Sequence, residues 1–161
     1  MNSFDVIVVG KGNAALCAAL AAVDRGARVA MLEAAPEGES GGNSRFAGGV
    51  MRFAYNTVED LTRVTDITPE EIVNTDFGTN TREEFLDKIY QLTAYRTDPD
   101  LSEYLVNESL DTMVWLRSKG VKFVPNWGRQ SAVVDGKRRF FGNMPIEAHG
   151  GGAGLVQYLD K

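Results

Sequence analysis

The chain has 161 residues, of which 43% are hydrophobic and 24% are charged, as in an ordinary globular domain that buries its own core. Its formal net charge of -5 argues against general binding to nucleic acid or anionic lipid, because both ligands require a basic surface. The single cysteine, Cys17, cannot form an intrachain disulfide. Its alanine-rich surroundings indicate a small core residue in a protein of a reducing compartment, and we expect a cytoplasmic location.

The first pattern along the chain is DVIVVG at residues 5–10, a β-branched run that predicts a parallel strand covered on both faces. No basic region precedes it, which argues against a signal peptide. The longest apolar run, residues 14–23, has ten residues and is too short to span a bilayer. An alanine-rich helix is predicted at about 13–25, ended by a left-handed turn at Gly26. ARVAMLE at 27–33 predicts a second strand.

The turn between the first strand and the helix has the pattern Gly10-x-Gly12-x-x-Ala15. In such a turn Gly10 permits the tight bend, Gly12 allows close approach of a pyrophosphate, and Ala15 allows close helix–strand packing. The helix N-terminus offers unpaired N–H groups to phosphates. Glu33, 23 residues after Gly10, can accept both ribose hydroxyls and would repel a 2′-phosphate, which disfavours NADP. The pattern predicts a dinucleotide site. The alternative is a glycine turn of another βαβ unit, with Glu33 a solvated strand end.

A second glycine-rich stretch, SGGNSRFAGGV, follows at residues 40–50. A loop of small residues lets the backbone approach a large flat ligand, and Asn43 and Ser44 add short donors and acceptors. We expect this loop to meet the half of the dinucleotide beyond the pyrophosphate. If that half is an isoalloxazine ring, the loop can hydrogen-bond to its edge. The alternative is a flexible glycine loop without a ligand.

These two stretches resemble the fumarate reductase/succinate dehydrogenase flavoprotein superfamily, and within it the FAD-dependent tricarballylate dehydrogenases. The resemblance continues through DPDLSEYLVNESLDTMVWLRSKGVKF and GGGAGLVQYL and covers nearly the whole chain. It implies an α/β fold: a Rossmann-like FAD-binding domain with a parallel βαβ core, a helical insertion and a β-hairpin, incomplete at the C-terminus. It also implies hydride transfer to flavin N5 from a C–C bond beside carboxylates, or the reverse reduction.

Tricarballylate, oxidised to an aconitate, is the substrate that the closest branch implies. After GGNS, however, this chain keeps AGGV, which is nearer the general superfamily pattern than the residues of close branch members. Fumarate reductase-like and ketosteroid dehydrogenase-like chemistry therefore stay open as alternatives. The resemblance also implies two partners, a small-molecule carboxylate substrate and an electron acceptor such as a membrane-associated redox protein.

The resemblance assigns roles to single residues. Ala14 and its neighbouring backbone would meet the FAD pyrophosphate, and Glu33 would hold the adenosine ribose. Asn43, Ser44 and Gly49 would lie along the flavin, with Ser44 near its reactive edge. The full predicted cofactor-binding set is Gly10, Gly12, Asn13, Ala14, Ala15, Glu33, Ala34, Gly42, Asn43, Ser44, Ala47, Gly48 and Gly49. No metal site is predicted, because the chain has one histidine and no Cys/His/Asp spacing that would complete a ligand set.

The chain divides into four predicted parts: a βαβ core at about 4–50, a helical segment at about 56–119, a strand and hairpin at about 121–142, and a glycine turn with the start of a helix at 149–161. Within the helical segment, Thr68 to Glu71 and Thr81 to Glu84 have the pattern of capping boxes. A third helix is expected to start at Asp98-Pro99. Its apolar residues change phase, which predicts a kink or break near Asn107. Asp135-Gly136 predicts a type I′ hairpin turn.

Several residues have two interpretations. The basic run at 137–139 is expected to be a solvated strand face. Trp115 and Trp127 are expected to pack in the core, and Phe140 and Phe141 either pack or border a flavin or substrate. Glu147 and His149 either neighbour the substrate or a proton relay, or simply flank a glycine turn that enters a helix near Ala153.

The resemblance places the substrate-capping domain and the proton-transferring arginine beyond Lys161. No catalytic residue is therefore assigned, and the chain is expected to be an N-terminal fragment that has no activity alone. The alternative to an enzyme fragment is a non-catalytic dinucleotide-binding module.

Overall fold

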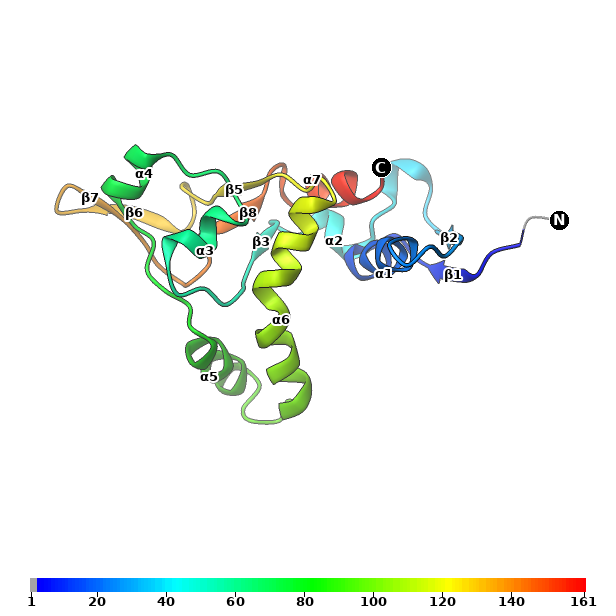
Figure 1. Cartoon of the computed structure of the whole chain (residues 1–161), viewed down its shortest axis with the longest axis horizontal. Helices are drawn as coiled ribbons and strands as arrows, with labels where there is room; N and C mark the ends of the chain where they lie inside the picture. Colours follow the sequence, from blue (N-terminus) through cyan, green and yellow to red (C-terminus); the bar gives the residue numbers. More distant parts are fainter. Residues whose placement is uncertain (1–2) are drawn as a thin grey trace. The chain divides into compact units, whose positions relative to one another are not determined.

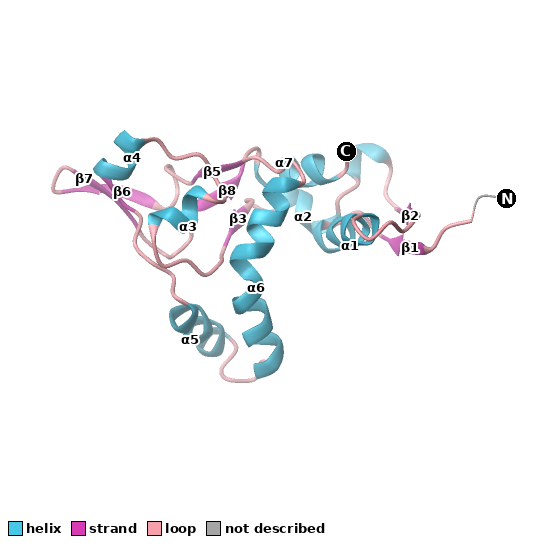
Figure 2. Ribbon diagram, in the orientation of Figure 1, coloured by secondary structure: helices cyan, strands magenta, loops and turns pink. Residues whose placement is uncertain are grey.

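The structure is a computed structural model that describes residues 3–161 (Figures 1 and 2). The chain forms two compact units. Among the described residues, the first unit consists of residues 3–49, 119–122 and 148–161, and the second consists of residues 50–118 and 123–147. Among residues 3–161, no helix is both long enough and apolar enough to cross a bilayer. The predicted four-part division of a single FAD-binding domain stays a prediction, because compactness alone does not test it.

The first unit begins with a strand, a helix and a strand. Strand β1 (Val6–Val9) pairs in parallel with β2 (Val29–Leu32), from Val6 opposite Val29 to Val9 opposite Leu32, and helix α1 (Asn13–Val23) connects and contacts them. The helix ends two residues earlier than predicted, because the N–H groups of residues 25 and 26 bond three residues back and tighten its last turn. Gly26 has a φ of +82°, so the predicted left-handed turn is confirmed.

The sequence predicts that strand β1 is covered on both faces. Among the described residues this prediction is wrong, because one face of β1 is exposed. Ile7 is 63% exposed and Val9 is 80% exposed, and on the neighbouring strand Leu32 is 56% exposed. The physical reason is that β1 and β2 form a two-stranded sheet with α1 packed against it, and alternate side chains of β1 point away from this packing.

Residues 34–50, predicted to be a loop, contain two short helical elements. A single 3-10 turn, η1 (Glu37–Glu39), precedes a helix of one and a half turns, α2 (Gly42–Phe46). The last helix of the chain, α7 (Gly151–Leu159), contacts both α1 and α2. It buries Leu155, Val156 and Leu159 on its inner face. In Figure 1, α7 lies beside α1 and α2.

The second unit contains two small sheets. Strands β3 (Val50–Met51), β8 (Ile146–Ala148) and β5 (Phe123–Pro125) form one sheet in the order β3-β8-β5. The other consists of β4 (Thr75–Asp76), β7 (Lys137–Phe140) and β6 (Ser131–Val134), in the order β4-β7-β6.

The predicted hairpin is the β6–β7 pair. Its strands are antiparallel, and its turn residues Asp135 and Gly136 have φ values of +52° and +77°. A type I′ turn requires positive φ at both positions, so the hairpin prediction is confirmed. Strand β4 adds to this hairpin in parallel, with Thr75 opposite Arg138. Residues 75–76 are thus a strand within the segment at about 56–119 that was predicted to be helical.

Four helices precede the hairpin: α3 (Val58–Thr62), α4 (Pro69–Asn74), α5 (Arg82–Leu92) and α6 (Pro99–Ser118). Both predicted capping boxes are present, since Thr68 and Thr81 each accept a bond from the backbone N–H three residues on, and Glu71 and Glu84 bond back. Helix α6 starts at Pro99, as predicted.

The predicted break near Asn107 is wrong, because α6 is one uninterrupted helix (Figure 2). Its buried residues Ser102, Val106, Met113 and Leu116 recur at one helical spacing throughout. The apparent change of phase came from apolar residues that do not face the core: Leu101, Tyr104 and Leu105 are all more than half exposed. Val106 instead packs with Ala54 and with Phe85 of α5.

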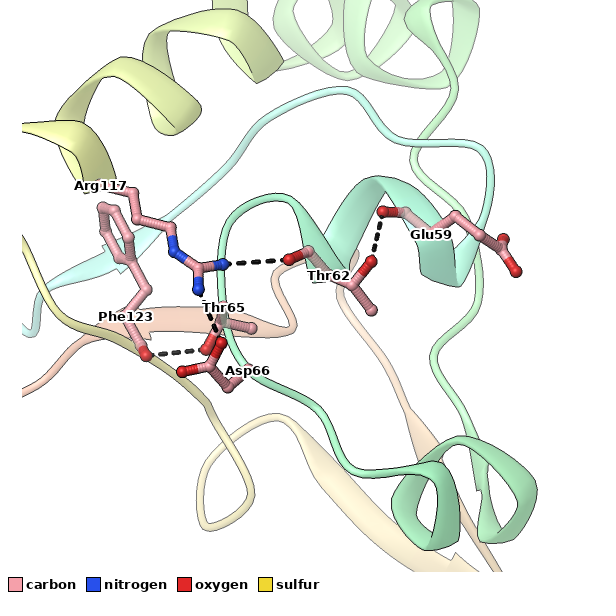
Figure 3. Close-up of polar contacts among 6 residues, drawn as sticks. All are labelled: Glu59, Thr62, Thr65, Asp66, Arg117 and Phe123. Carbon is pink, nitrogen blue, oxygen red and sulfur yellow. Dashed lines mark hydrogen bonds and ion pairs between the residues drawn. The ribbon is translucent and has the colours of Figure 1, made fainter.

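Polar contacts tie α3 and the segment after it to the end of α6 and to β5 (Figure 3). Arg117 donates to the carbonyl of Thr62 at 3.0 Å and forms an ion pair with Asp66 at 2.6 Å. The buried hydroxyl of Thr65 donates to the carbonyl of Phe123 at 2.7 Å. These bonds satisfy backbone carbonyls outside regular pairing, so the segment after α3 is held in place by side chains.

An aromatic cluster in the second unit decides the interpretation of two residues. Phe140 stacks on Phe77 with ring centroids 5.1 Å apart, and Trp127 lies 5.2 Å from Phe140. Packing is therefore confirmed for Trp127 and Phe140, whereas Phe141 is exposed. Of the basic run on β7, Lys137 and Arg139 are solvated as predicted, but Arg138 is half-buried over the ring of Trp127.

Candidate functional site

The first glycine loop turns the chain from β1 into α1. Gly10 has a φ of +101°, which glycine adopts readily, and its N–H donates to the carbonyl of Leu32 at 2.6 Å. A Cβ on Gly10 would lie 3.9 Å from the Cβ of Ala15, so the start of the helix is close to the strand end, as predicted. Ala14 and Ala15 occupy the first turn of α1, where backbone N–H groups have no partner within the helix.

Gly12 caps the N-terminus of α1 and shows whether this loop fits a ligand. Its backbone is extended, with φ −72° and ψ 171°, a conformation open to any residue. A Cβ on Gly12 would lie 3.6 Å from the Gly41 carbonyl and the Ser44 hydroxyl, which is ordinary contact. Neither the backbone nor the packing requires glycine here. Glycine is required at this position only if a ligand occupies the space above the helix N-terminus. The loop therefore fits a pyrophosphate.

The second glycine cluster lies directly against the first. The hydroxyl of Ser44, on α2, accepts a hydrogen bond from the backbone N–H of Asn13 at 3.0 Å. A Cβ on Gly42 would lie 3.9 Å from the Cα of Gly12. The structure thus brings Gly10, Gly12, Asn13, Gly42 and Ser44 together at the start of α1. Ser44 organises the predicted phosphate loop, whereas its predicted place at the flavin edge stays a prediction.

A third glycine segment, at the start of α7, explains part of the second cluster. A Cβ on Gly152 would lie 1.9 Å from the Ser44 carbonyl, and a Cβ on Gly49 would lie 2.6 Å from the backbone of Gly151. The N–H of Gly152 donates to the carbonyl of Ala47 at 2.9 Å. Backbone therefore packs on backbone here. Gly49 and Ala47 have this structural role, and their predicted contact with a cofactor stays a prediction.

A pocket of about 610 Å³ opens beside the first loop. Glu33, at the end of β2, lines it and accepts a hydrogen bond from the backbone N–H of Ala35 at 2.9 Å. This bond lowers the pKa of the Glu33 carboxyl, and the backbone N–H and charge of Lys11 act in the same direction. Glu33 is therefore an ionised acceptor at neutral pH, as ribose hydroxyls require. The other lining residues are Lys11, Ala35, Glu37, Ser40, Arg45, Ala153, Val156, Gln157 and Asp160.

Sequence reasoning missed most residues of this pocket. Lys11 lies between the two predicted glycines, and its ammonium forms an ion pair with Asp160 of 2.6 Å. Lys11 could have been identified from its place in the motif. Asp160 and Gln157 gave no signal, because they follow α1 by more than a hundred residues and reach the pocket only through the packing of α7.

The remaining predicted residues lie on the surface of the first unit. Ala34 follows Glu33 and is exposed, and Asn43 and Gly48 are exposed at the two ends of α2. Exposed side chains and backbone at these positions are accessible to a ligand. Their predicted cofactor contacts stay predictions. Among the described residues, no group of three His, Cys, Asp or Glu side chains could hold a metal ion.

Glu147 and His149 each have a protein partner of their own. Glu147 forms an ion pair of 2.7 Å with Arg129, and Nδ1 of His149 lies 3.1 Å from the Tyr158 hydroxyl. Each side chain is thus held by a contact within the protein. Their predicted place beside a substrate or a proton relay stays a prediction. Cys17 lies 3.6 Å from the side-chain oxygen of Asn13, and burial raises the pKa of its thiol, which is the property of a packing residue.

We expect Ser44→Ala to lower the free energy of unfolding by about 1 kcal/mol, because it leaves the Asn13 N–H at the helix start without its acceptor. Urea unfolding followed by circular dichroism measures the change. Ser118→Ala is the matched control, since that exposed hydroxyl bonds only to the carbonyl of Trp115 in its own helix. Equal stability of the two variants would contradict the capping role.

Comparison with known proteins shows the family of the chain. The sequence model of one family, the FAD binding domain, matches residues 5–145. The chain is 29% identical over 150 residues to a fumarate reductase (cytochrome) of Shewanella frigidimarina, which covers 92% of this chain and 23% of the relative. It is 28% identical over 127 residues to a vinyl phenol reductase of Lactiplantibacillus plantarum, which covers 76% of this chain and 21% of the relative. The chain thus spans less than a quarter of the length of these relatives.

Two solved structures share the fold. The open conformation of a flavocytochrome c3 fumarate reductase matches with a TM-score of 0.63 and 25% identity, covering 98% of this chain and 24% of that one. A 3-ketosteroid-Δ4-(5α)-dehydrogenase from Rhodococcus jostii RHA1 matches with a TM-score of 0.66 and 20% identity, covering 98% and 35%. The predicted α/β class with parallel strands is confirmed, and the Rossmann-like detail stays a prediction.

Proposed function

The chain belongs to the FAD binding domain family, and on that premise we propose that it supplies the FAD-binding part of a flavin-dependent oxidoreductase. FAD is the cofactor of this family, and when bound it supplies the hydride acceptor. One observation carries the proposal. Residue 12, at the N-terminus of α1, is glycine although its backbone conformation and its neighbours both leave room for a side chain. A diphosphate above the helix N-terminus accounts for that glycine.

The residues of the first unit divide the work of holding the dinucleotide. The backbone N–H groups of Ala14 and Ala15 face the pyrophosphate and gain from the positive end of the helix dipole. Ser44 keeps the Asn13 N–H and the start of α1 in place. The ionised carboxylate of Glu33 accepts the adenosine ribose hydroxyls from its side of the pocket. The same charge disfavours a 2′-phosphate, which separates FAD and NAD from NADP.

We propose that the whole protein acts on a C–C bond beside carboxylates. A proton would leave one carbon for a base and a hydride would leave the next for the bound flavin, or the reverse reduction would occur. The names of two relatives, a fumarate reductase and a vinyl phenol reductase, both describe reduction of compounds with a C=C bond, and the first of these compounds is a carboxylate. By the sequence resemblance, the proton-transferring arginine is not among these residues, so we expect the 161-residue chain to bind FAD without turning over substrate.

For the substrate, we propose tricarballylate, oxidised to an aconitate. The support is the sequence resemblance of GKGNAALCAAL and GGNSRF to that branch. Fumarate is the substrate to test beside it, because a fumarate reductase is among the relatives. Oxidation of a substrate requires an electron acceptor that reoxidises the flavin. We propose a separate redox protein, such as a membrane-associated one, and a cytoplasmic location in keeping with the single cysteine.

The test is FAD uptake by the purified chain, followed by its visible absorption spectrum and by quenching of flavin fluorescence, with NAD as a competing dinucleotide. We expect FAD to bind, and we expect Glu33→Ala to weaken binding about ten- to a hundredfold, the effect of losing hydrogen bonds to a charged group. Glu39→Ala is the control, because this exposed carboxylate lies in η1, a few residues after Glu33, but does not line the pocket.

Each outcome has a clear meaning. A folded chain that takes NAD and not FAD would overturn the flavin proposal. Unchanged FAD affinity in Glu33→Ala would remove Glu33 from the ribose site. Bleaching of bound flavin on addition of tricarballylate to this chain alone, or reoxidation of its reduced flavin on addition of fumarate, would contradict our expectation that catalysis requires further residues.

A further inference from the structure

The pocket beside Glu33 contains more charge than a ribose requires. Three charged side chains meet there from separate parts of the chain: Lys11 in the first glycine loop, Glu33 at the end of β2, and Asp160 at the end of α7. Glu37 and Arg45 are the other charged residues that line it. Arg45 donates to the carbonyl of Ser40. One lysine thus lines the same pocket as Glu33 and Asp160, and it is paired with Asp160.

The lysine is held by Asp160. Its Nζ lies 2.6 Å from one carboxylate oxygen of Asp160 and 2.7 Å from the other, so the carboxylate is engaged by both oxygens. The side chains are 24% and 37% exposed, so the pair is only partly screened by solvent. Glu33 instead accepts a hydrogen bond from the Ala35 backbone at 2.9 Å, and the backbone N–H groups of Ala34 and Lys11 also act on its carboxylate.

We propose that Asp160 is a positioning residue for the dinucleotide: it holds the Lys11 ammonium so that the Glu33 carboxylate stays free to accept the ribose hydroxyls. This inference rests on the proposed function. Without Asp160, we expect the flexible lysine side chain to pair with Glu33, because both side chains line the same pocket and the charge of Lys11 acts on that carboxyl. A ribose would then have to displace an ion pair before it could bind.

A set of three variants tests this assignment. We expect Asp160→Asn to weaken FAD binding about threefold, the value of a partly exposed ion pair that the ribose must break. We expect the double variant Lys11→Met/Asp160→Asn to return to the affinity of the unchanged chain, because the competing ammonium is gone. Asp24→Asn is a matched control: Asp24 pairs with Lys119 in the same unit, and the pair is 22% and 37% exposed.

The same variants have a readout that needs no FAD. The pKa of the Glu33 carboxyl, followed by carbon NMR in a pH titration, should fall further in Asp160→Asn, because a nearer cation favours the ionised form. It should recover in the double variant. If the unchanged chain does not bind FAD, the proposed function fails, and this titration still decides the place of Lys11.

Three results would overturn the inference. An unchanged Glu33 pKa in Asp160→Asn would show that the lysine does not move to Glu33. Tighter FAD binding in Asp160→Asn would show that Lys11 serves the phosphates. Equal weakening in Asp160→Asn and in the double variant would show that the ion pair only fastens α7 to the glycine loop.

Discussion

We expect Gly152→Ala to lower the free energy of unfolding by about 3 kcal/mol, the upper end of the usual cost of overpacking. The added Cβ would lie 1.9 Å from the Ser44 carbonyl and 2.7 Å from the Ala47 carbonyl. Both are backbone atoms, which cannot rotate away as a side chain would, so α7 has to move off α2. Because Ser44 also holds the start of α1, FAD binding should weaken together with stability.

Urea unfolding and a flavin-binding titration measure the two effects of Gly152→Ala. Gly38→Ala is the matched control in the same unit, since its φ is ordinary and nothing lies within 4 Å of the added Cβ. The control should change neither quantity. If Gly152→Ala is as stable as Gly38→Ala, then α7 does not pack on α2 as closely as the structure shows.

We expect Gly12→Val to abolish measurable FAD binding while β1 and α1 still form. The extended backbone at Gly12 accepts a β-branched residue, but the side chain would occupy the space above the helix N-terminus that a pyrophosphate needs. Gly12→Ala should weaken FAD binding less, by about ten- to a hundredfold, because its side chain is smaller. The fold should be unaffected, because the added Cβ makes only ordinary contacts within the protein.

Flavin fluorescence titration and far-ultraviolet circular dichroism separate binding from folding in the two Gly12 variants. Gly38→Ala again controls for the loss of backbone freedom. Normal FAD binding by Gly12→Val would show that this loop does not hold the pyrophosphate. A loss of helix signal in Gly12→Ala would show instead that the fold itself requires glycine at this position.

The features that the sequence predicted correctly are those determined by neighbouring residues. The capping boxes at Thr68 and Thr81, the hairpin turn at Asp135 and the left-handed turn at Gly26 each depend on the chemistry of two to four consecutive residues. The βαβ arrangement around Gly12 was also predictable, because the strand, the turn and the helix follow one another directly. Local preferences and the final fold agree at these places.

The features that were missed depend on packing between distant segments. The sequence did not show that Gly152 rests on the Ser44 backbone, or that Asp160 reaches Lys11. It also predicted a break in α6 near Asn107 that is absent, because Leu101 and Leu105 are apolar but exposed, whereas Val106 packs in the core. A pattern of apolar residues identifies a helix, but it does not say which apolar residues meet a neighbour.

The first unit is assembled from three separate pieces of chain, and this has a consequence for its synthesis on the ribosome. Residues 1–49 contain the glycine loop, but the helix that packs against it lies in residues 148–161. At ordinary translation rates, about 5–20 s pass between the appearance of the first piece and the last. During that interval the loop exists without the helix that packs on it, so a nascent chain acquires the pocket beside Glu33 only near the end of this stretch.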